Sequence, residues 1–109
     1  MPQKINPLAV LSRRLKQARE RKGLSQKQLG IAARLDRFVA STRINRYERG
    51  VHQPDPVTVQ RLADALDVPV AFLFASDERL ARMILAFSSL SAKVQDSVIA
   101  DLERMVERR

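Results

Sequence analysis

Several residue types are missing from this 109-residue chain, and each absence removes a class of function. There is no cysteine, which excludes a disulfide framework, a cysteine-ligated zinc ion and a thiol nucleophile. His52 is the only histidine, so no second histidine or cysteine could share a metal ion with it. The sequence has neither a glycine-rich phosphate loop nor a nucleophile motif. We therefore expect no enzyme activity, no cofactor and no metal site.

Long apolar segments are also missing. No run approaches the roughly 20 residues of a membrane span, and the N-terminal MPQKINPLAV has too short an apolar part for a signal peptide. A cytoplasmic protein without a membrane association is therefore the expectation. Aromatic residues make up only 5% of the chain while hydrophobic residues make up 45%, so the core should consist of packed aliphatic helices.

Negative charge is scarce in the first half of the chain. Residues 1–53 hold thirteen Lys and Arg against three acids, a net charge of +10, whereas residues 54–109 carry a net charge of −2. So one-sided a distribution favours a polyanionic partner over a merely solvated surface, because like charges repel one another. Nucleic acid is the commonest such partner. An anionic membrane is the other candidate, but no basic helix has a strong apolar face with Trp or Phe.

The first predicted helix covers Pro7–Lys22. Asn6 is a capping residue, Pro7 suits the first helical position, and Gly23 is a typical left-handed stop. The residues of this segment would form two faces. One is an apolar stripe at helical spacing, and the opposite face is charged and includes Arg14. The stripe consists of Leu8, Leu11, Leu15 and Ala18. Residues 1–5, before the cap, are expected to form a loose arm.

A second helix is predicted to begin after Ser25. Ser25 and Gln28 have the spacing of a capping box, in which each side chain bonds the backbone of the other. Leu29, Ala32 and Ala33 should form the buried edge of this helix. Gly30 lies inside it at a cost of up to about 1 kcal/mol relative to Ala, and close packing is one reason for a glycine there.

The segment LDRFVA, residues 35–40, leaves two interpretations of the third helix open. In the first it is a long loop, and the helix covers Ser41–Arg49. In the second Asp36 caps a helix over Arg37–Arg49, with Ala40, Ile44 and Tyr47 as its buried line. Phe38 and Val39 would then pack at the junction.

Four more helical segments follow and complete an all-α prediction. Apolar spacing predicts a core helix over Pro56–Leu66, a short turn over 70–74, an amphipathic helix over 77–87 and a last helix capped by Ser91. We expect a domain over residues 1–76 and a C-terminal helical pair over 77–109. This pair would either pack on its own domain or, the interpretation we favour, form a dimer. The last helix would supply an apolar stripe of Val94, Val98, Leu102, Met105 and Val106.

Three segments resemble the Cro/phage-repressor-type helix-turn-helix family, also called the Xre family: LSQKQLGIAA, ASTRINRYERG and PDPVTVQRLADALDVPVAFLF. The resemblance implies a five-helix domain with its motif over residues 25–49, in which the third helix enters the major groove of double-stranded DNA. It places Tyr47 in the core or beside the backbone and not at the bases, and it pairs Glu48 with an arginine of the same domain. The segment before Ser41 is longer than the tight turn of the family. The implied DNA-binding residues are Gln26, Lys27, Ser41, Thr42, Arg43, Asn45, Arg46 and Arg49.

These roles differ within the set. Gln26 would lie at the phosphate backbone and steady a side chain of the third helix, and Arg49 would contact a phosphate. Ser41, Thr42 and Asn45 would face bases, with Arg46 further along the same face. The function implied is a sequence-specific transcriptional repressor that binds a pseudo-palindromic operator as a homodimer. The alternative is an antitoxin that binds a toxin through its C-terminal helices and autoregulates its operon.

Overall fold

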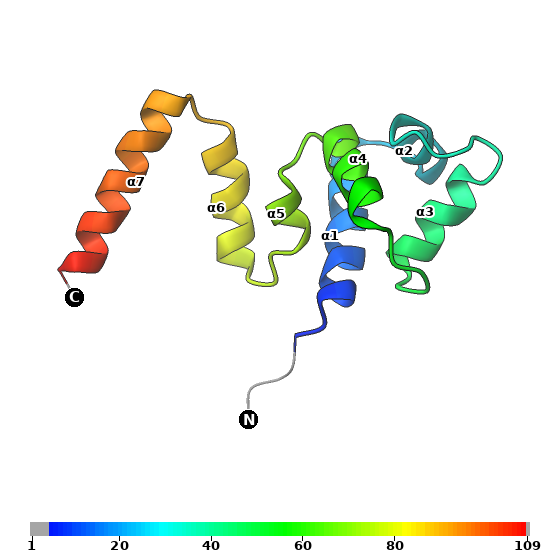
Figure 1. Cartoon of the computed structure of the whole chain (residues 1–109), viewed down its shortest axis with the longest axis horizontal. Coiled ribbons are helices and arrows are strands. Elements are labelled where there is room, and N and C mark those ends of the chain that lie inside the picture. The colour runs from blue at the N-terminus through cyan, green and yellow to red at the C-terminus, as the bar shows by residue number, and fades with distance from the viewer. Residues whose placement is uncertain (1–4, 109) are drawn as a thin grey trace.

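The computed structural model describes residues 5–108 and is all-helical over that range (Figure 1). The predicted arm over residues 1–5 lies outside the described residues except for Ile5. Five helices lie in the first part of the chain and two follow, as predicted. Their bounds are α1 Pro7–Lys22, α2 Gln26–Ala32, α3 Ala40–Glu48, α4 Pro56–Leu66, α5 Val70–Leu73, α6 Glu78–Ser88 and α7 Ala92–Glu107.

Helix α1 begins and ends at the predicted residues because local backbone chemistry sets both ends. The Asn6 side chain accepts a hydrogen bond from the backbone N–H of Leu8 at 3.0 Å. Gly23 follows the helix at a φ of 75°, and its N–H bonds the carbonyls of the last turn. Helix α4 has the same design, with Asp55 accepting from Thr58 N–H at 2.7 Å.

The core lies where α1 to α5 meet. Aliphatic side chains fill it, as the composition predicted, and Phe72 and Leu73 of α5 complete it. Helix α6 packs against α5 through the buried Ala81, with Ile84 and Leu85 partly buried beside it. The largest apolar side chains with almost no exposure are Leu11, Leu15, Leu29, Ile44, Leu62 and Leu73.

Arg14 corrects the predicted face of α1. We placed it on the charged outer face, yet it is fully buried. Its Nε donates to the carbonyl of Ala75 at 2.8 Å and its Nη1 donates to Glu78 Oε2 at 2.9 Å, while the guanidinium lies over the Phe72 ring. The segment from α5 to the start of α6 packs against α1 and covers Arg14, a contact that the spacing within α1 does not reveal.

Helices α2 and α3 approach each other closely at Gly30. A Cβ built on Gly30 would lie 2.6 Å from the Cβ of Ala40, the first residue of α3. Close packing therefore explains the glycine inside α2. The predicted buried edge of α2 is correct for Leu29 and Ala33 but wrong for Ala32, which is exposed.

Residues 35–39 form a loop, so the interpretation of α3 as a helix from Arg37 is wrong. Asp36 does not cap a helix, because its Oδ1 accepts the N–H of Phe38 at 2.8 Å in a local turn. Helix α3 begins at Ala40 with Val39 as its N-cap, which makes no side-chain capping bond. Phe38 does not pack at the junction, since 88% of it is exposed.

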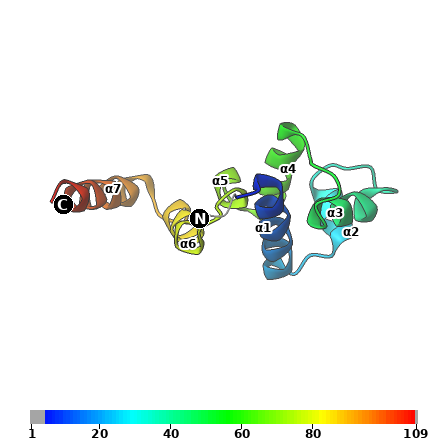
Figure 2. The ribbon, with the colours of Figure 1, turned by 90° about the horizontal axis from the view of Figure 1, so that it is seen from below.

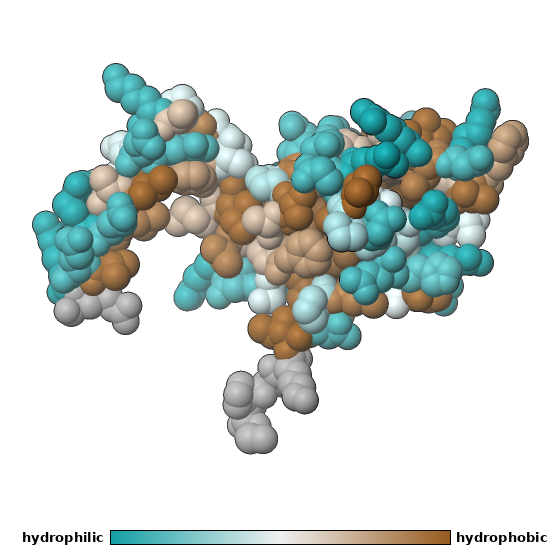
Figure 3. Space-filling view, viewed as in Figure 1, coloured by the Kyte–Doolittle hydropathy of each residue, from teal (hydrophilic) through white to brown (hydrophobic). Residues whose placement is uncertain are grey.

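Helix α7 lies at the opposite end of the molecule from α2 and α3 (Figures 1 and 2). It has no buried residue, and no closely packed helix pair among the described residues includes it. Apolar side chains gather on the side of α7 that faces α6, whereas its outer side is hydrophilic (Figure 3). Of the two predicted C-terminal helices, α6 thus packs on its own domain and α7 does not.

Candidate nucleic-acid interface

Helix α3 has a buried face and an exposed face. Ala40, Ile44 and Tyr47 are buried in the core, and this spacing turns the other sides of the helix outward. Residues three or four apart on the outer side lie next to one another. The predicted contacts Ser41, Thr42, Asn45, Arg46 and Arg49 are all exposed or half-buried on that side.

This outer side combines short hydrogen-bonding groups with cations. Asn can form two hydrogen bonds with the edge of adenine, and Arg can do so with guanine, each pair giving about 1–3 kcal/mol of discrimination between bases. Ser and Thr are short enough to allow the helix close to the floor of the groove. Arginines that meet phosphates instead fix the position of the helix on the duplex.

Arg43 occupies a different environment from the rest of the set. It is half-buried, and its Nη2 donates to the hydroxyl of Tyr47 at 2.6 Å. Its guanidinium also lies over the Tyr47 ring, 5.7 Å from the centroid. Arg43 therefore packs against Tyr47, next to the buried side of α3, and not among the exposed residues of its outer side.

Glu48 joins three helices around its carboxylate. Arg19 of α1 donates to it twice, from Nε at 2.6 Å and from Nη2 at 3.0 Å, and Gln26 of α2 donates from Nε2 at 3.1 Å. The bidentate hydrogen bond to Glu48 raises the pKa of Arg19 above its ordinary value, although burial lowers it. The predicted pairing of Glu48 with an arginine of the domain is confirmed. This cluster fixes the end of α3 relative to the start of α2.

The start of α2 presents donors beside the end of α3. Ser25 and Gln28 form the predicted capping box, with bonds of 3.0 Å from Gln28 N–H to Ser25 Oγ and 2.8 Å from Ser25 N–H to Gln28 Oε1. Gln26, the first residue of α2, is half-buried and bonds Glu48 as predicted, whereas Lys27 is exposed. The α2 N-terminus and a cation are thus available to a phosphate on this side.

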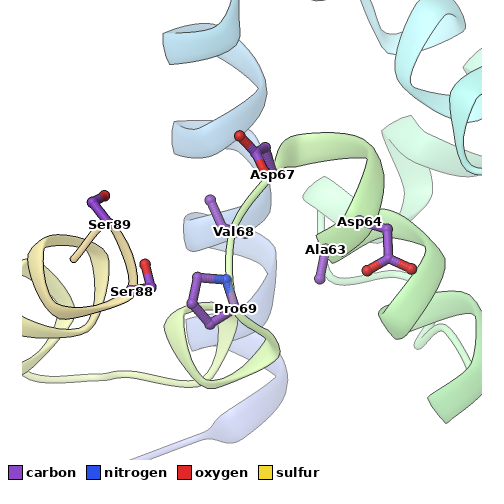
Figure 4. Close-up of a pocket in the computed structure, with 7 residues that line it drawn as sticks. All are labelled: Ala63, Asp64, Asp67, Val68, Pro69, Ser88 and Ser89. Carbon is purple, nitrogen blue, oxygen red and sulfur yellow. The ribbon is translucent and has the colours of Figure 1, made fainter. Parts of the chain in front are cut away.

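A pocket of about 440 Å³ lies between the end of α4, the segment after it and the end of α6 (Figure 4). Its two carboxylates, from Asp64 and Asp67, point in different directions. Asp64 also accepts a hydrogen bond from Gln60 at 2.9 Å. The groups around this pocket therefore form no acid–base pair.

Helix α2, the connecting loop and α3, with polar and basic side chains on the outer side of α3, define a helix-turn-helix DNA-binding domain. The family model described as a helix-turn-helix domain matches residues 10–72. The chain belongs to this family, and within it to the Xre/Cro-like transcriptional regulators.

Two solved structures resemble the chain over much of its length. The transcriptional regulator BswR is 43% identical with a TM-score of 0.79, over 85% of this chain and 92% of that chain. The restriction-modification controller protein C.AhdI from Aeromonas hydrophila is 36% identical with a TM-score of 0.55, over 62% of this chain and 96% of that one. Among curated proteins the comparison finds no match. Neither structure is described as an antitoxin, so they lend the antitoxin alternative no support.

Residues 5–108 contain neither a membrane span nor a metal-binding cluster. No helix in this range is long and apolar enough to cross a membrane. No group of three or more His, Asp or Glu side chains in the same range is arranged to hold a metal ion.

Proposed function

We propose that the chain binds a specific DNA operator in the major groove through the exposed side of α3. The observation that carries the proposal is the segregation within α3, where Ile44 and Tyr47 are buried while Asn45, Arg46 and Arg49 face outward. A helix held in this way can present side chains to base edges without losing its packing. The Glu48 cluster supports the proposal further, because it keeps α2 and α3 in one fixed arrangement.

We also propose that two copies pair through α7. One helix-turn-helix contacts only a few base pairs, so a two-fold dimer doubles the site and requires a pseudo-palindromic operator. Within the predicted apolar stripe on α7, Leu102, Met105 and Val106 are exposed by 39%, 63% and 62%. A second copy of the same helix could bury this stripe. The proposal keeps residues 1–76 as the DNA-binding unit. Of the predicted dimerising pair over 77–109, it assigns the pairing to α7, because α6 packs on its own domain.

Repression is the regulatory outcome that we propose, in the cytoplasm where the DNA lies. A dimer on its operator excludes RNA polymerase from the same DNA, so repression needs no contact beyond DNA binding. A transcription reaction with the operator placed across a promoter tests whether the protein represses or activates transcription. Added protein should reduce the transcript, and an increase would identify an activator instead.

The DNA-binding proposal is tested by selecting an operator from random DNA and measuring affinity over a salt series. The operator should bind more tightly than scrambled DNA, and equal affinities would contradict the proposal. Asn45→Ala should lower the free-energy difference between the preferred base and the others at one operator position by about 1–3 kcal/mol. Arg49→Ala should weaken binding to all sequences alike and reduce the salt slope by about 1. Arg82→Ala, an exposed arginine on α6, is the matched control and should leave the slope unchanged.

Dimerisation is tested by placing a charge in the stripe on α7. Leu102→Glu should dissociate the dimer in sedimentation equilibrium, because a buried unpaired carboxylate is strongly unfavourable. It should weaken binding to the full operator while leaving affinity for a half-site unchanged. Glu103→Ala alters a neighbouring exposed residue and serves as the control. A Leu102→Glu variant that dimerises like the original would refute pairing through this stripe.

A further inference from the structure

The loop between α2 and α3 is built to hold its tip in place. At its start Leu35 is buried, and its N–H donates to the Gly30 carbonyl at 2.9 Å. In its middle, Asp36 accepts from Phe38 N–H through its side chain and from Val39 N–H, at 3.1 Å, through its carbonyl. At its end Ala40 is fixed against Gly30. These contacts order the loop backbone on both sides of Phe38.

Phe38 is 88% exposed, the highest value among the large apolar side chains in the described part of the chain. A single exposed apolar residue is ordinary on a protein surface. Here, however, the ring sits on a turn that hydrogen bonds hold in place, and it has no packing role in the domain. An aromatic ring held outward in this way is suited to contact a partner.

The position of the loop relative to α3 indicates where that contact would occur. Phe38 lies two residues before Ala40, at the N-terminal end of α3. In helix-turn-helix proteins this end of the recognition helix meets the base edges. The loop extends beyond the start of α3, at the end of the molecule opposite α7 (Figures 1 and 2). Its tip would therefore lie in or beside the major groove when α3 is docked.

The charges around Phe38 favour a nucleic acid as the partner. Arg34 and Arg37 are exposed on the same loop, and the Arg37 guanidinium lies 5.8 Å from the centre of the Phe38 ring. Asp36 is the one acid in the loop, and its carboxylate accepts the Phe38 N–H. An apolar ring flanked by cations suits a groove with phosphate walls and apolar methyl groups on its floor.

We propose that Phe38 is a further base-reading residue, which contacts the 5-methyl group of a thymine in the major groove beside the bases facing α3. The thymine methyl is the one apolar group on the major-groove edges, and phenylalanine is among its known partners. Arg34 and Arg37 contact the flanking phosphates. This inference rests on the proposed operator binding and adds a second source of sequence preference outside α3.

The experiment removes the methyl group and the ring separately and together. Each thymine of the selected operator is replaced in turn by deoxyuridine, which lacks only the 5-methyl group. The original chain should lose about fourfold in affinity at one thymine per half-site, the value of one buried methyl group. Phe38→Ala should bind the unmodified operator more weakly and show no further loss at that thymine. Phe74→Ala, another exposed phenylalanine, is the matched control and should retain the methyl sensitivity.

Three outcomes overturn the inference and remain distinct from failure of the proposed function. The first is full methyl sensitivity in Phe38→Ala, and the second is an original chain whose affinity changes at no single thymine methyl. The third is loss of self-association in Phe38→Ala by sedimentation, which would place the ring between two copies. In each case the original chain would still prefer its operator to scrambled DNA. Loss of that preference would instead remove the proposed function itself.

Discussion

Replacing Glu48 with Ala tests whether its carboxylate holds α1, α2 and α3 together. The side chain of Glu48 is 4% exposed and that of Arg19 is 13% exposed, so the pair is nearly buried. Removing one partner of a buried pair costs about 3–5 kcal/mol, because the other charge is left uncompensated. Arg19 keeps its bond of 2.9 Å to the Leu24 carbonyl, which favours the lower end of this range. We expect Glu48→Ala to lower the free energy of unfolding by about 3 kcal/mol.

Urea unfolding followed by far-ultraviolet circular dichroism measures this loss, with an unchanged dependence on urea concentration as the sign of a two-state comparison. Glu20→Ala is the control, because Glu20 is an exposed acid on α1 that also acts on Arg19 through space. Its loss should cost less than about 1 kcal/mol. Arg19→Met combined with Glu48→Leu should recover most of the stability, since no charge is left buried. A loss below about 1 kcal/mol in Glu48→Ala would refute this account of the cluster.

Two further substitutions test the packing and the capping of the domain. Gly30→Ala should lower the free energy of unfolding by about 1 kcal/mol or more, because the clash with Ala40 outweighs the higher helix propensity of alanine. A variant that is more stable in urea unfolding would contradict the close approach of α2 and α3. The hydrogen bond from Thr58 N–H holds the pKa of the Asp55 carboxyl below its ordinary value. The carboxylate therefore stabilises the fold at a pH above the ordinary carboxyl pKa. This contribution to stability disappears as the pH falls through the lowered pKa of the folded state. Asp55→Ala should therefore show a smaller fall in Tm between neutral and acidic pH, and an unaltered fall would argue against the cap.

The local signals in the sequence set the ends of several helices. The cap and stop residues around Pro7–Lys22 and Pro56–Leu66 predicted both helices to the residue, because a capping bond joins groups two or three residues apart. The predicted DNA-facing residues near the end of α3 follow from the same kind of information. Asn45 and Arg49 face outward because the neighbouring Ile44 and Tyr47 are apolar and turn inward.

The tertiary structure decided which of these residues another segment covers. Arg14 looks like a surface residue of α1 and becomes buried because α5 and the segment after it pack over it. Two of its partners, Ala75 and Glu78, lie more than sixty residues away in the chain. Phe38 would pack at the junction in the interpretation that begins α3 at Arg37. It is exposed instead, because it lies in the Asp36 turn before α3 begins. Helical period and capping chemistry are properties of neighbouring residues and can be read from the chain. Burial depends on distant segments, so only the folded chain placed Arg14 in the core and Phe38 outside it.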